Sequence, residues 1–110
     1  MDTTIPVNVS TRFETARVAK TEPITDIIKV RSNSRTSAVA GAIAGVVRDR
    51  QRAEVQAIGA SAINQAVKAM ALAKGYLFQD GISIIFIPEF VDVKIDEKIR
   101  TAIKFVVEPR

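Results

Sequence analysis

Residues 53–68 read AEVQAIGASAINQAVK, and they contain a change from strand to helix that organises the rest of the chain. The first six form a strand pattern, in which Val55 and Ile58 are the expected buried members. Gly59 interrupts this pattern, and the alanine or serine that follows it can begin a helix. We therefore predict a strand over residues 53–58 and a helix directly after the glycine.

The second half of this stretch begins a helix that we expect to run to about Lys74. Gly75 follows and is expected to act as the C-cap, because glycine tolerates the left-handed conformation found there. Apolar residues recur at helical spacing along one side of this segment. The residues predicted to face inward are Ile63, Val67, Met70 and Leu72.

Upstream, a second strand and helix precede residue 53. Residues 24–31 form a compact apolar strand, residues 32–35 read as a polar loop, and residues 37–51 form a helix. Thr36 or Ser37 is expected to cap this helix through its side chain. The predicted inward residues of the helix are Val39, Ile43, Val46 and Val47.

Downstream, two long strands end the chain. From Ile82 the even positions are apolar, whereas beyond Pro88 the odd positions are apolar. Because side chains alternate between the faces of a strand, this switch predicts a bulge or kink near the proline. The last strand keeps a single alternation from Ile99 to Val107, with its odd positions inward.

The element order is therefore β-α-β-α-β-β, which predicts an α/β two-layer sandwich. Right-handed crossovers place both helices on one face of a mixed four-stranded sheet. Residues 1–23 are rich in threonine, lack a sustained period and carry equal numbers of basic and acidic residues. We expect a flexible N-terminal arm over 1–23 and one domain over 24–110, to which the net charge of +4 belongs.

The composition narrows the classes of function. The chain has 110 residues, of which 47% are hydrophobic and 25% charged, and it contains no Cys, His or Trp. It thus lacks the commonest general base, the thiolate nucleophile and the usual zinc ligands. No segment approaches the ~18 apolar residues of a spanning helix, and the N-terminus lacks the features of a signal peptide. We expect a cytoplasmic protein that is not an enzyme and uses no metal, cofactor, small-molecule substrate or membrane.

The terminal hairpin allows two interpretations. If Ile95 pairs with Ile99 across the turn Asp96-Glu97-Lys98, Lys94 lies opposite Arg100, and like charges form a basic stripe that an anion would stabilise. In the competing register Asp96 pairs with Arg100, the charges neutralise one another and the hairpin is purely structural.

The loop from Arg31 to Arg35 is a second candidate for binding an anion. It combines two guanidinium groups with Ser32 and Asn33 directly before a helix, whose free N–H groups and dipole attract phosphate. A simple capping loop would have the same composition, so both interpretations stay open.

Several stretches resemble the stage V sporulation protein S family. They are AVAGAIAGVVR at residues 38–48, AEVQAIGA at 53–60, NQAVKA at 64–69, and TAIK and VEPR in the last strand. The similarity covers about residues 26–110. It implies an Alba-like fold, which in nucleic-acid-binding relatives faces the nucleic acid with the loop before the first helix, the start of the second helix and the terminal hairpin.

This resemblance implies a non-enzymatic regulatory protein that binds DNA or RNA and forms a homodimer or higher homo-oligomer. Alba proteins carry a lysine in the turn where this chain has Asn64 and Gln65, and their hairpin arms are longer and more basic. An alternative is therefore an oligomeric protein-interaction module that has the fold without the binding. The residues to which the resemblance extends nucleic-acid binding are Arg31, Ser32, Asn33, Arg35, Asn64, Gln65, Lys68, Lys94, Lys98 and Arg100.

Overall fold

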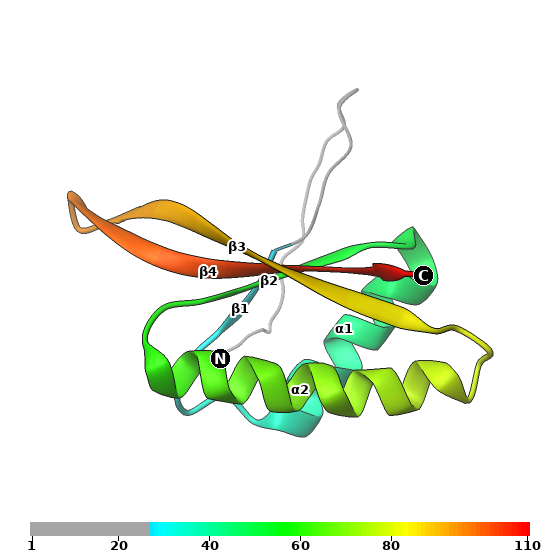
Figure 1. The fold of residues 1–110 in the computed structure, drawn as a ribbon. Coiled ribbons are helices and arrows are strands. Elements are labelled where there is room, and N and C mark those ends of the chain that lie inside the picture. Colours follow the sequence, from blue (N-terminus) through cyan, green and yellow to red (C-terminus); the bar gives the residue numbers. More distant parts are fainter. Residues whose placement is uncertain (1–26) are drawn as a thin grey trace.

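A computed structural model describes residues 27–110. The elements are β1 (Ile27–Val30), α1 (Thr36–Arg50), β2 (Ala53–Ala57), α2 (Ala60–Phe78), β3 (Ile84–Ile95) and β4 (Lys98–Pro109). The strands form one sheet in the order β1-β2-β4-β3, in which only the β1–β2 pair is parallel. Both helices cover the same face of the sheet (Figure 1). The predicted two-layer α/β architecture is confirmed, whereas the expected arm over 1–23 lies outside the described residues.

The core lies between the two helices and the sheet. Ile43, Val47 and Leu77 from the helices and Val55 and Val107 from the sheet are its largest fully buried side chains. Alanines form most of the buried side of α2, and they let its backbone approach α1 and the sheet closely. The residues predicted to face inward on α1 do so. The prediction for α2 is partly wrong, because Val67 is 48% exposed and Leu72 is 41% exposed.

The helix ends differ from the predictions. Arg35 occupies the N-cap of α1, and no side chain caps that helix, so Thr36 and Ser37 do not have the expected role. Helix α2 continues past Gly75 to Phe78. A glycine is tolerated there because it lies on the exposed side of a helix already held by its buried alanines. The left-handed glycine is instead Gly81, with φ 77°, in the turn before β3.

Strand β3 runs through Pro88 with no bulge, in one continuous register with β4 from Ile84 opposite Pro109 to Ile95 opposite Lys98. The predicted kink is therefore wrong. The physical reason is visible in Figure 1, where the end of the β3–β4 hairpin extends beyond the helices and the other two strands. Apolar side chains in that part have no helix layer to face. Val91 and Val93 accordingly lie on the helix-free face of the sheet, and Pro88 is tolerated because β3 is an edge strand.

The hairpin turn has two residues, Asp96 with φ 51° and Glu97 with φ 64°. Two left-handed residues in succession form the type of turn that matches the twist of paired strands. Both predicted registers are therefore wrong. Lys94 lies opposite Ile99, and Arg100 lies opposite Val93, so the two cations are on different faces of the hairpin.

Candidate nucleic-acid interface

An open cleft of about 880 Å³ lies where β1, β2 and the terminal hairpin end. One wall comprises the end of β1 with the first loop residues, the second comprises the β2–α2 turn with the start of α2, and the third is β3 near the hairpin tip. The lining residues are 27, 29–32, 56–62 and 93–95. The cleft thus brings together three segments that are distant in the sequence.

The loop before α1 is a closed turn that presents its side chains outward. The backbone N–H of Arg31 donates to Oγ of Ser34 at 2.8 Å, and the N–H of Ser34 donates back to the carbonyl of Arg31 at 3.0 Å. Arg31, Ser32, Asn33 and Arg35 are all exposed. Arg31 and Ser32 line the cleft, whereas Asn33 and Arg35 lie on the same loop outside its lining.

Of the three candidates on α2, Gln65 has a different role from the one expected. Its side-chain Nε2 donates a hydrogen bond to the backbone carbonyl of Ser34 at 2.8 Å, and the group is partly buried. Gln65 therefore fixes the loop to α2. Asn64 and Lys68 are exposed on α2, and neither belongs to the lining of the cleft.

On the hairpin, Lys94 belongs to the cleft, and the cations of β4 lie nearby. Lys98 is opposite Ile95 and Arg100 is opposite Val93, so both share a face with residues that line the cleft. The basic stripe expected from Lys94 through Arg100 is wrong as a single-face arrangement. The strand's next cation, Lys104, is ion-paired instead.

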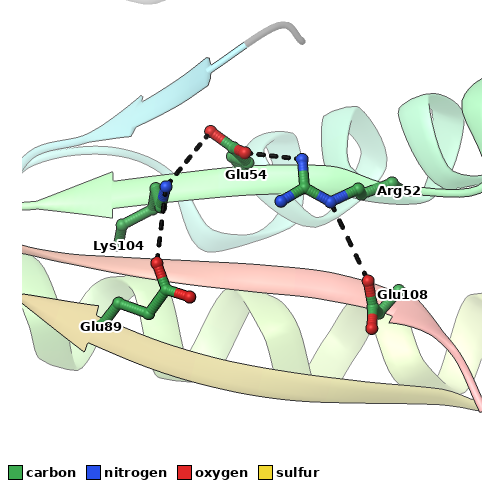
Figure 2. A network of polar contacts seen from close by, with 5 residues as sticks. All are labelled: Arg52, Glu54, Glu89, Lys104 and Glu108. Carbon is green, nitrogen blue, oxygen red and sulfur yellow. Dashed lines mark hydrogen bonds and ion pairs between the residues drawn. The ribbon is translucent and has the colours of Figure 1, made fainter.

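A cluster of opposite charges crosses the helix-free face of the sheet (Figure 2). Glu54 is only 8% exposed, and its Oε2 accepts a hydrogen bond from Nη1 of Arg52 at 2.6 Å. Lys104 Nζ lies 3.9 Å from Oε1 of Glu54 and 3.5 Å from Oε1 of Glu89, while Arg52 Nε lies 3.9 Å from Oε2 of Glu108. We call these five residues the ion-paired cluster.

The cations near the cleft have no such partners. They are exposed, and none of them forms an ion pair with another residue of the described range 27–110. We call this set the cation surface, and its members are Lys29, Arg31, Arg35, Lys94, Lys98 and Arg100. Within residues 27–110, the cations of the ion-paired cluster thus have acidic partners, whereas those of the cation surface are available for an external anion.

Lys29 lines the cleft but is not among the site residues predicted from the sequence. It alternates outward between two inward residues, Ile28 and Val30, which is the ordinary pattern of a solvated strand position. Its place in the cleft depends on where the hairpin ends, and no local signal carries that information.

A comparison with known protein families identifies the domain that carries the cleft. The family model for stage V sporulation protein S matches residues 26–110 of the sequence. The chain belongs to this family. Within this stage V sporulation protein S domain, the matched range includes the loop, both helices and the hairpin, and hence every residue of the cation surface.

Two further properties of the described part of this family member bear on its site. No helix in residues 27–110 is long and apolar enough to cross a membrane. In the same range, Asp and Glu side chains do not gather into a group of three that could hold a metal ion.

Proposed function

We propose that this chain is a non-enzymatic regulatory protein that binds DNA or RNA through the cation surface. The observation that carries the proposal is that three exposed cations without acidic partners in residues 27–110 line one cleft, and three more lie on the adjoining loop and hairpin. The family description associates such proteins with sporulation, and a regulatory role in that process fits a small binding protein.

Binding in this account is mainly electrostatic. Lysine and arginine neutralise phosphates and release counterions, which gives affinity without reading the base sequence. The hydrogen bonds of Ser34 and Gln65 hold the backbone of the loop at Arg31 in place before any ligand arrives. Less conformational entropy is therefore lost when the loop binds a ligand. Three acidic residues on the hairpin, Asp92, Asp96 and Glu97, limit the net attraction. We therefore expect roughly micromolar affinity and a clear dependence on salt.

The test is a fluorescence anisotropy titration of labelled DNA and RNA oligonucleotides at low and moderate salt. Arg31→Glu and Lys94→Glu should each weaken binding about fivefold to tenfold and reduce the salt dependence by about one phosphate contact. Arg110→Glu is the matched control, since it makes the same charge change at an exposed position beyond the far end of β4. No binding of any oligonucleotide by the folded protein at low salt would overturn the proposal.

We also propose that the chain forms a homodimer through α2 and the edge strand β3. Phe78 is 73% exposed and Phe90 is 80% exposed, and Phe90 lies on the helix-bearing side because it pairs with Ile103, which packs against the core. Val67 on α2 is exposed as well, and exposed apolar side chains of this size are typical of a subunit contact. Light scattering should give twice the chain mass, and Phe90→Asp should reduce it to the single-chain mass. A single-chain mass for the unaltered protein at about 100 μM would contradict the dimer.

The same exposed apolar residues favour a second candidate, an oligomeric protein-interaction module that does not bind nucleic acid. The two candidates differ in which surface function requires. If Lys94→Glu with Arg100→Glu leaves function intact in cells while Phe90→Asp abolishes it, assembly is the essential property. Loss of function in both variants supports nucleic-acid binding by an assembled protein.

A further inference from the structure

The cleft has the size of a small-molecule site. Clefts that enclose small ligands have volumes of about 300–1,000 Å³, and this one measures about 880 Å³. A smaller hollow between α2 and the turn before β3 measures about 330 Å³ and is lined largely by apolar groups. A surface that only followed a phosphate backbone would not require such a concavity.

The lining of the cleft combines cations with exposed apolar side chains. Lys29, Arg31 and Lys94 belong to it, and none of its lining residues within the described range 27–110 is acidic. Ile27 on β1 is 45% exposed, and Ile95 on the hairpin is 41% exposed. The strand registers place Ile27 near the start of β1 and Ile95 at the hairpin tip, so the two isoleucines line different ends of the cleft. The cleft therefore suits an anion that also carries a weakly polar ring.

We propose that the cleft binds a single unstacked nucleotide, with its phosphate on a cation of the lining and its base against the apolar wall at Ile95. The hydroxyls of Ser32 and Ser61 and the amide of Gln56 also line the cleft and can donate hydrogen bonds to base or phosphate oxygens. This inference rests on the proposed nucleic-acid binding and adds a preference to it. A base in a duplex is stacked and paired, so it cannot enter the cleft, whereas a base in a single strand can.

The first experiment compares ligands of equal length at one salt concentration. The probes are a labelled 12-nucleotide oligothymidylate, the same strand in a 12-base-pair duplex, and free thymidine monophosphate as a competitor. We expect the single strand to bind at least about fivefold more tightly than the duplex. If free thymidine monophosphate at millimolar concentration displaces the labelled strand, the cleft accepts a mononucleotide as well as a strand, and this result also supports the site.

Variants of the cleft that leave its charge unchanged separate this inference from the proposed function. Ser61→Trp fills the cleft from an exposed position on the first turn of α2, and Ile95→Ala removes one apolar wall. Each should weaken binding of the single strand about tenfold and leave duplex binding unchanged. Ala42→Trp, at an exposed position of α1 outside the cleft, is the matched control. Circular dichroism confirms that each variant is folded.

The outcomes are distinguishable. If duplex and single strand bind equally and both cleft variants bind the single strand like the unaltered protein, the nucleotide site is overturned while electrostatic nucleic-acid binding stands. If no oligonucleotide binds but thymidine monophosphate does, and Ser61→Trp abolishes that binding, the cleft is a nucleotide site and the proposed function is overturned. If neither class of probe binds, both proposals are overturned.

Discussion

The ion-paired cluster and the cation surface contain the same types of basic residue, but they differ in whether acidic side chains lie close to them. In the cluster, Arg52 and Lys104 share the nearly buried Glu54 and each has a second carboxylate within 4.0 Å. On the cation surface, residues such as Arg31 and Lys94 have no acidic partner in the described chain. Since both sets contain the same residue types, their difference lies in the neighbours that the fold supplies. The cluster stabilises the sheet, and the surface is available to a ligand.

The largest expected effect comes from breaking the cluster. Glu54→Ala removes the carboxylate that two cations share, leaving Arg52 with only the more distant Glu108 and Lys104 with only Glu89. We expect the free energy of unfolding to fall by about 2 kcal/mol, because the cluster loses its one buried carboxylate and the hydrogen bond that it accepts from Arg52. Urea denaturation measures this. Nucleic-acid binding should be unchanged at temperatures where the variant is folded.

Glu97→Ala is the control for that measurement, since it removes an exposed carboxylate that has no ion-pair partner in the described chain. Its denaturation midpoint should stay close to that of the unaltered protein. Equal destabilisation by the two substitutions would show that the cluster contributes no more than an ordinary surface charge.

A smaller effect is expected at the junction between α2 and the cation surface. Gln65→Ala removes the hydrogen bond that holds the Ser34 carbonyl, which should cost about 1 kcal/mol of stability. The loop then samples other conformations, so binding should weaken about threefold and the amides of residues 31–35 should exchange faster with solvent. Gln65→Glu, which cannot donate this hydrogen bond, should behave in the same way. Unchanged amide exchange in the loop would contradict a positioning role for Gln65.

The smallest effect is expected at the hairpin tip. Glu97 has a φ of 64°, which glycine adopts without strain, so Glu97→Gly should stabilise the hairpin by about 0.5 kcal/mol. The substitution also removes an acidic residue next to Lys98 and should strengthen oligonucleotide binding about twofold at low salt. Thermal denaturation and anisotropy titration measure the two effects. Weaker binding would mean that the tip carboxylate contributes to the interface.

The sequence predicted the order of elements, the two layers and the inward side of α1, because these depend on patterns that a packed core enforces. The incorrect predictions concern segments that do not pack against the helices. Beyond the helices, the apolar residues of β3 have no layer to face, so the expected bulge at Pro88 is absent. The turn at Asp96 and Glu97 lacks the usual glycine, so its two-residue length has no local signal.

For the candidate site, residue type pointed to the loop and hairpin cations but not to their arrangement. Arg31 and Lys94 are separated by 63 positions, and only the fold places both in one cleft. Gln65 was expected to contact a ligand, yet its amide bonds the loop carbonyl. Lys29 and Glu54 follow the same outward alternation, but one borders a cleft and the other lies in an ion-paired network. Such differences depend on tertiary neighbours.

The most direct measurement compares both regions in a single titration. Backbone amide resonances of the isotope-labelled full chain are followed by NMR while the 12-nucleotide single strand is added at low salt. The account predicts that the signals of residues 29–35, 58–62 and 93–100 shift, whereas those of residues 48–54 and 104–110 stay in place. Shifts confined to the ion-paired cluster, or equal shifts in both regions, would contradict the claim that the cation surface binds the nucleic acid.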